Sequence, residues 1–158
     1  MINDYVTRMI EQITQAILAI IGFRKSENYK EARKVIKSTG RYLLRMDIDL
    51  LLLFTYDQIL DHFKDLSKCY ETEKCVLGAD LFHEMALIEQ VENKPEKALR
   101  LKMLSLHLYT IGIPKEKQFQ NHQYLKKVSK LTEELVNYSL PHNLLKSLKS
   151  YQEFTKQT

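Results

Sequence analysis

The sequence predicts an all-α fold of six or seven antiparallel helices. In most segments apolar residues recur at spacings of three and four, which gathers them on one face of a helix. The 158 residues include only 4 Gly and 3 Pro, too few for the many tight turns of an all-β fold. The length suits a single helical domain over residues 1–158 with one hydrophobic core.

The first two helices should form a hairpin over residues 3–46. The apolar spacing predicts helices over residues 3–22 and 28–46, and Asn28 is a suitable N-cap for the second. Gly22 stands where it can close the first helix. Because the link is short, the two helices should pack antiparallel.

A short third helix should follow at residues 56–68, because Thr55 and Gln58 have the spacing of a capping box. Just before it stands an unbroken apolar run of Leu50, Leu51, Leu52, Leu53 and Phe54. Successive helical residues rotate by about 100°, so one helix face cannot bury all five. An apolar patch that stays exposed usually marks an interface, and we therefore expect a homodimer.

A second hairpin should span residues 73–111. Its first helix is expected at residues 73–91. Pro95 suits the start of its second helix, since a proline in the first turn loses no helical hydrogen bond. Gly112 lies just past the expected end of that helix at Ile111.

Two further helices should complete the domain over about residues 116–155. The apolar spacing predicts one helix over residues 116–138, and Pro141 opens the other. The connecting segments are short here too, so helices that follow one another in sequence should pack antiparallel.

Charge is segregated along the chain, although the net charge is only +4. Residues 24–46 hold eight basic and two acidic side chains, whereas residues 47–93 hold three basic and eleven acidic ones. At 100° per residue, six basic residues of the second helix fall within about 120° of one another. This basic face consists of Lys30, Arg33, Lys34, Lys37, Arg41 and Arg45. It could bind an anionic partner, or it could be solvated or pair with the acidic segment of the same chain.

The histidines and cysteines fit no metal or catalytic motif. Zinc ligands usually include cysteine pairs separated by two to four residues, a spacing that His62, Cys69, Cys75 and His83 do not supply. The sequence contains no glycine-rich phosphate loop, and nothing marks any of the 5 His as the base of a nucleophile. We therefore expect no catalytic residue, no metal and no cofactor.

No stretch of the sequence predicts secretion or insertion into a membrane. The apolar run at residues 16–23 is much shorter than the about 20 residues that a spanning helix needs. Asp4, Arg8 and Glu11 stand where a signal peptide would have a basic and then an apolar segment. We expect a cytoplasmic protein with reduced thiols and no membrane contact.

Both predicted hairpins carry a small residue near the start of their second helix. The first turn reads Glu27-Asn28-Tyr29-Lys30-Glu31-Ala32, and the second reads Glu92-Asn93-Lys94-Pro95-Glu96-Lys97-Ala98. These segments resemble the turns of the 34-residue tetratricopeptide repeat, with Ala32 and Ala98 as the small residues at the close contact of the two helices. The resemblance implies stacked helical hairpins, whose concave grooves commonly bind peptides.

A second resemblance begins at the N-terminus. It is carried by Met1-Ile2-Asn3-Asp4-Tyr5, Arg8-Met9-Ile10-Glu11-Gln12, Tyr29-Lys30-Glu31-Ala32 and Asp47-Ile48-Asp49-Leu50-Leu51. Together these segments resemble an uncharacterised bacterial family of small all-helical, tetratricopeptide-like proteins that is labelled a domain of unknown function. The resemblance extends from residue 1 to about residue 150. It implies the fold and no reaction.

These features lead us to expect a non-catalytic interaction module that binds a protein or peptide. The alternative is a nucleic-acid- or polyanion-binding protein that uses the basic face. Residues 47–93 make nucleic acid the less favoured partner, because a polyanion near the basic face would feel their negative charge within a Debye length of about 8–10 Å. An enzyme whose site leaves no mark in the sequence is a third alternative.

Overall fold

The structure, a computed structural model, describes residues 2–64 and 71–157, with only the backbone of residues 2 and 3. Within these ranges the chain forms helices and no strand, which confirms the all-α prediction. The α-helices are α1 (Ile2–Lys25), α2 (Tyr29–Leu44), α3 (Ile48–Leu51), α4 (Tyr56–His62), α5 (Thr72–Val91), α6 (Pro95–Gly112), α7 (His122–Leu135) and α8 (His142–Lys156). Two short 3-10 helices, η1 (Ile113–Lys115) and η2 (Lys117–Phe119), connect α6 to α7.

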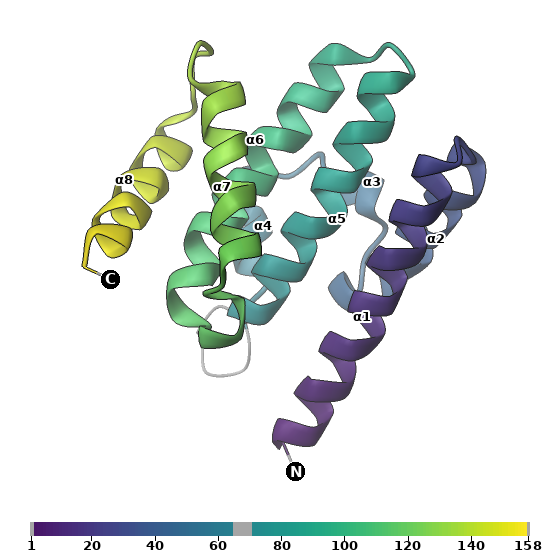
Figure 1. Ribbon diagram of the computed structural model, residues 1–158, viewed down its shortest axis with the longest axis horizontal. Helices are drawn as coiled ribbons and strands as arrows, with labels where there is room; N and C mark the ends of the chain where they lie inside the picture. Colours follow the sequence, from purple (N-terminus) through teal and green to yellow (C-terminus); the bar gives the residue numbers. More distant parts are fainter. Residues whose placement is uncertain (1, 65–70, 158) are drawn as a thin grey trace.

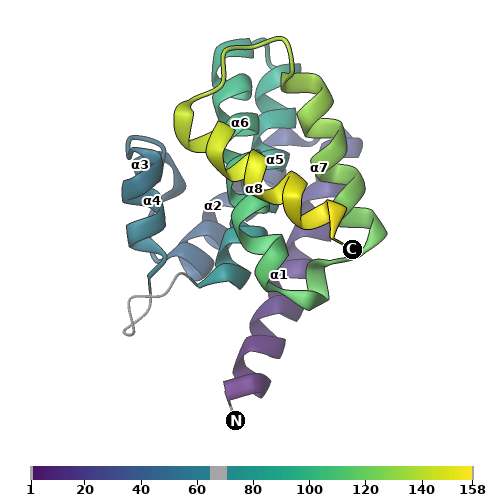
Figure 2. The same ribbon diagram turned by 90° about the vertical axis from the view of Figure 1, so that its left-hand side faces the viewer.

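The long helices alternate in direction. In Figure 1, α1, α5 and α7 run one way along the molecule, and α2, α6 and α8 run back. Figure 2 shows α3 and α4 at the edge of the molecule opposite α7. The helices α1, α5 and α7 therefore run in the same direction, and the short helices α3 and α4 lie at the edge opposite α7.

The two hairpin turns share one backbone geometry. Glu27 and Asn93 are both left-handed, with φ angles of 61° and 62°. One residue later, the N–H groups of Asn28 and Lys94 each donate to the carbonyl five residues back, at 2.8 Å and 2.9 Å. A left-handed residue followed by this bond is a common way to end a helix with its last carbonyls paired. The α1–α2 and α5–α6 turns are thus one structural unit used twice.

The residues that predicted the hairpins take the expected places. The side-chain oxygen of Asn28 accepts a hydrogen bond from the N–H of Glu31 at 3.4 Å and caps α2. Ala32 and Ala98, which occupy matching positions in α2 and α6, are both buried. A small side chain at such a position lets two helices approach closely.

The end of α1 differs from the prediction. We expected Gly22 to close the helix, but α1 continues one turn further to Lys25. The backbone reaches a left-handed conformation only at Glu27, so Gly22 lies inside the helix. A Cβ atom added at Gly22 would meet no atom within 4 Å.

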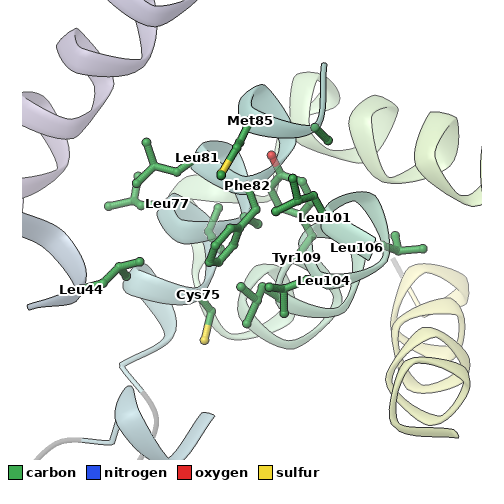
Figure 3. Close-up of a cluster of buried hydrophobic side chains, with 14 of the residues drawn as sticks. Leu44, Cys75, Leu77, Leu81, Phe82, Met85, Leu101, Leu104, Leu106 and Tyr109 are labelled. Atoms are coloured by element: carbon green, nitrogen blue, oxygen red, sulfur yellow. The ribbon is translucent and has the colours of Figure 1, made fainter. Parts of the chain in front are cut away.

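The core is centred on α5, which packs against α1 and α2 on one side and against α6 on the other. Fourteen of its 20 residues are buried, so α5 is an internal helix with no continuous solvent face. Figure 3 shows Phe82 of α5 beside Tyr109 and Leu104 of α6. The buried apolar side chains form one cluster that extends from α1 to α8.

The segment after α2 contains a short helix that the sequence did not predict. Asp47 caps α3 by accepting a hydrogen bond from the N–H of Asp49 at 2.9 Å. The expected third helix is α4, which ends at His62 rather than at residue 68; residues 65–70 lie outside the described part of the chain. Its capping box is confirmed, because Thr55 and Gln58 exchange both of the expected hydrogen bonds.

The apolar run before α4 divides between core and solvent. Leu51 is fully buried, and Leu52 and Phe54 are half-buried. Leu50 and Leu53 remain 55% and 80% exposed. Part of the run therefore packs internally, and the homodimer stays a prediction that rests on the two exposed leucines.

The connection from α6 to α7 also differs from the prediction. We expected a helix over residues 116–138, but α7 begins only at His122, after the two 3-10 helices, and ends at Leu135. Gly112 is the last residue of α6 rather than the residue beyond it. A Cβ atom added there would lie 2.6 Å from a methyl carbon of Val76 and 2.8 Å from the carbonyl oxygen of Thr72. A glycine is needed because the end of α6 approaches the backbone of α5.

Two glycine substitutions test this packing. Gly112→Ala should lower the free energy of unfolding by about 1–3 kcal/mol, because the added methyl group overpacks the contact with α5. Gly22→Ala should raise it by up to about 1 kcal/mol, since alanine stabilises an open helix position. Urea unfolding measures both. Equal effects of the two substitutions would contradict the close approach of α6 to α5.

Candidate functional site

Three carboxylates on the internal helix α5 are almost completely buried. The exposed fractions of the side chains of Asp80, Glu84 and Glu89 are 4%, 8% and 0%. Each is paired with a basic residue from a different helix, the three partners being Lys127 of α7, Arg24 of α1 and Arg33 of α2. A buried carboxylate without such a partner costs several kcal/mol, so each pair ties one neighbouring helix to α5.

The pair at Glu89 joins the two hairpins. Arg33 donates to Glu89 at 2.7 Å and to Glu92 at 2.6 Å, and Lys97 and Lys94 lie 3.6 Å and 3.8 Å from Glu89. Burial acts to raise the pKa of Glu89. The hydrogen bond from Arg33 and the three positive charges outweigh burial and lower it. Glu89 is therefore ionised and serves as the electrostatic link between α2, α5 and the start of α6.

A polar cluster surrounds Asp80, halfway along α5. Tyr109 of α6 donates its hydroxyl to one carboxylate oxygen, and Lys127 donates to the same oxygen at 3.1 Å. Tyr124 of α7 donates to the other oxygen at 2.7 Å. Burial first, and the negative Asp80 second, raise the pKa of both tyrosines well above the usual value. The Asp80 cluster therefore joins one carboxylate to two neutral hydroxyls and the side chain of one lysine.

The Asp80 cluster lies at the base of a groove between α1 and α7. The groove has a volume of about 280 Å³. Asp80 and Leu77 of α5 form part of its lining, along with Tyr124 and Lys127 on the α7 side. Among the described residues, Asp80 and Lys127 are the charged members of its lining.

The wall that α1 contributes has no charge. Its lining residues are Ile10, Thr14, Ile17, Leu18 and Ile21. Spacings of three, four and seven place them along one side of the helix, next to the face that packs into the core. Leu18 is 57% exposed. A helix with a core face and a second apolar face is suited to bind an apolar partner along the groove.

The helix α1 is also long and apolar enough to resemble a membrane-spanning helix. By length and apolar composition alone, Asp4–Lys25 could cross a membrane, a test that the core helices of soluble proteins and N-terminal signal sequences also pass. Only 22% of its most apolar stretch is buried. Thr14 and Leu18 of the groove wall belong to its exposed part.

The predicted basic face of α2 is on the surface, but most of it already has acidic partners. Arg33 binds Glu89 and Glu92, as described above. Three further pairs join Lys34 to Glu31 at 3.2 Å, Arg41 to Asp47 at 3.4 Å and Lys37 to Asp49 at 3.9 Å. Among the described residues, no carboxylate lies within ion-pair distance of Lys30 or Arg45. The pairing of this face with the acidic segment, one of the alternatives open at the sequence level, thus accounts for much of it.

The histidines and cysteines considered as ligands are spread over the fold. The ring of His62 bonds to the carbonyl of Leu44 at 2.6 Å, and Cys75 is buried on α5 with burial raising its thiol pKa to about 12. His83 is half-buried, and Cys69 lies outside the described residues. Over residues 2–64 and 71–157, no three His, Cys, Asp or Glu side chains gather as a metal site would require.

One serine and one histidine meet at the distance of a nucleophile and its base. The Oγ atom of Ser147 on α8 lies 2.9 Å from Nδ1 of His107 on α6. Burial lowers the pKa of His107 to about 4, so the ring is a poor base at neutral pH. Its Nε2 atom has no hydrogen-bond partner among the described residues, so no third group orients it. The ring of Tyr56 stacks on that of His107, with the two ring centroids 4.7 Å apart. These contacts are typical of a histidine that packs in the protein interior.

Sequence reasoning missed every member of the Asp80 cluster. One signal was available, because Asp80 stands between the apolar residues Ala79 and Leu81 in the helix predicted for residues 73–91. A charged residue inside a buried band must find a partner. The identity of that partner, Lys127, depends on the packing of α7 and is not encoded locally.

Comparisons of the chain with protein-family models, with curated proteins and with solved structures gave no match. The resemblance to a bacterial helical family therefore stays a prediction. Function is inferred from the geometry of the chain itself.

The low pKa of His107 predicts a specific pH dependence. The folded state binds this proton only near pH 4, whereas an unfolded histidine binds it near pH 6.5. The free energy of unfolding should therefore fall as the pH drops from about 6.5 to about 4, by up to about 1.4 kcal/mol per pH unit for this group.

The variant His107→Gln should lose that contribution to the slope. His122→Gln, which replaces an exposed histidine at the start of α7, is the matched control and should leave the slope unchanged. Urea unfolding at four pH values measures it. The same slope in the wild type and in His107→Gln would show that His107 is not buried in its neutral form.

Proposed function

We propose that this protein is a non-catalytic interaction module that binds a peptide segment of a partner protein in the groove between α1 and α7. The observation that carries the proposal is the uncharged wall that α1 contributes to the groove, from which Thr14 and Leu18 are exposed to solvent. Binding in a groove of this kind places the apolar side chains of a peptide against α1 and leaves its backbone to pair within itself or with polar groups nearby.

The Asp80 cluster supports a binding role rather than a reaction. All of its charged and hydroxyl groups are paired with one another, so it holds α7 at a fixed distance from α5 and preorganises the groove. Such preorganisation lowers the conformational cost of binding. Lys127, which is 27% exposed, keeps donor positions that a peptide carbonyl or carboxylate could use.

Two further observations favour binding over catalysis. The Ser147–His107 pair has a weakly basic ring and no orienting third group. The α1–α2 and α5–α6 turns repeat one geometry, as in helical repeats that present grooves to peptides. This last point is an analogy at the level of fold and adds to the groove geometry without replacing it.

A selection experiment tests the groove. Peptides displayed on phage and selected against the whole protein should include binders whose affinity falls at least about tenfold on Leu18→Glu, because a charge then occupies the apolar wall. Ala19→Glu is the matched control, since Ala19 is an exposed neighbour on α1 that does not line the groove. Fluorescence polarisation measures both affinities.

The same experiment has contrary outcomes. Selected peptides that bind Leu18→Glu as tightly as the wild type would place the binding surface elsewhere. Binding to neutral phosphatidylcholine vesicles that Leu18→Glu abolishes would instead make the exposed face of α1 a lipid-binding surface.

The alternative partner, a nucleic acid on the basic face, has less support, because Arg33, Lys34, Lys37 and Arg41 are already paired within the chain. Binding of six phosphates would give a salt slope of about −5 and would require these pairs to break. We predict no specific binding to duplex or single-stranded DNA at physiological salt, measured by titration at two salt concentrations. Submicromolar binding that disappears on changing Lys34, Lys37 and Arg41 together to Glu would reverse the ranking.

A further inference from the structure

A second cavity lies among α4, α6 and α8, none of which lines the groove. Its volume is about 400 Å³. Leu60 of α4, Ile111 of α6 and Tyr151 of α8 supply apolar surface. Cavities of about 300 Å³ or more with mostly apolar linings are the usual sites for small organic molecules.

One wall of this cavity is polar and held in place by internal hydrogen bonds. The hydroxyl of Thr110 lies 2.9 Å from that of Ser147, which in turn contacts the ring of His107. Ser147 also lies 3.1 Å from the carbonyl oxygen of Leu144. Ser150 follows one turn later on α8 and lines the same cavity. The wall therefore combines a fixed hydroxyl with an exposed one.

Two lysines stand in the lining of the cavity. Among the described residues, Lys115 and Lys146 are the charged side chains that line it. The nearby Asp57 does not line it and accepts a hydrogen bond from Asn143 at 3.1 Å. Ser150 stands four residues after Lys146 and three after Ser147 on α8, spacings that bring both onto the side of the helix that carries Ser150.

We propose that this cavity binds a small organic anion with an apolar body. The anionic group lies against Lys146 and Ser150 of α8, and the apolar body lies against Leu60, Ile111 and Tyr151. The volume suits a ligand with two or three rings or a chain of similar size. This site shares no residue with the groove, so it does not depend on the proposed peptide binding.

The probe for this site is the fluorescent anion 1-anilinonaphthalene-8-sulfonate, with N-phenyl-1-naphthylamine as a neutral compound of the same ring system. We expect the anion to bind the native protein with one site per chain. Lys146→Met should lower the affinity for the anion by about threefold to tenfold, because it removes a partly solvated, charge-assisted contact. The neutral compound should be little affected. Ser150→Phe should weaken the binding of both compounds, because the added ring occupies part of the cavity.

Lys149→Met is the matched control, since Lys149 is an exposed lysine of α8 outside the cavity lining. Circular dichroism confirms that each variant is folded, and amide chemical shifts place the bound probe. The proposal is supported if amide shifts change at Thr110, Ser147 and Ser150, and if Lys146→Met loses affinity for the anion while Lys149→Met does not. No binding, equal effects of the two lysine variants, or shifts gathered at Thr14 and Leu18 of the groove would overturn it.

Discussion

The buried ion pairs of α5 are the interaction on which the rest of this structure depends. Asp80, Glu84 and Glu89 lie on one internal helix, and each holds a basic side chain from a different neighbour, α7, α1 or α2. Apolar packing determines which helix faces meet, but it discriminates less sharply between arrangements that bury similar apolar area. A slide that separates any pair leaves a buried charge unpaired, which costs about 3–5 kcal/mol. The pairs therefore select one arrangement of helices among those that bury similar apolar area.

Two of these pairs also shape the groove. Lys127 is drawn toward α5 by Asp80, and Arg24 anchors the C-terminal end of α1 to Glu84 at 2.6 Å. The middle of α1 and the first turns of α7 are left facing one another across α5. The cavity among α4, α6 and α8 does not involve these ion pairs. It lies where α4 and α8 flank α6. The fold thus offers two surfaces of different chemistry, a neutral groove with paired charges at its base and an apolar cavity with positive residues around it.

The parts of the fold that follow from local physical chemistry were predictable. The N-cap Asn28, the capping box of Thr55 and Gln58, and Pro95 at the start of α6 act within a few residues of themselves, so the sequence reveals them. The ends of α1 and α6 were less predictable, because a glycine can mark either a helix end or a close approach. Gly112 belongs to the second kind, and only its contact with Val76 and Thr72 distinguishes the two.

The candidate sites were not predictable, since they join residues that are far apart in sequence. Arg24 and Glu84 are separated by 60 positions, and Thr110 and Ser147 by 37. The segregation of charge between residues 24–46 and 47–93 did indicate that the two segments attract one another. It could not indicate which carboxylates are buried. The helix α5 is enclosed on almost every side, so its polar residues do not mark a solvent face as they would in an amphipathic helix.

Native-state hydrogen exchange of the whole chain tests most directly whether α5 and its ion pairs unite the helices into one unit. The account predicts that buried amides of α2, α5 and α6, such as those of Ile36, Phe82 and Leu106, exchange with one free energy. That value should equal the free energy of global unfolding measured by urea. If α1 and α2 instead open together at a free energy several kcal/mol below that of α5 and α6, the ion pairs do not couple the hairpins, and the account is contradicted.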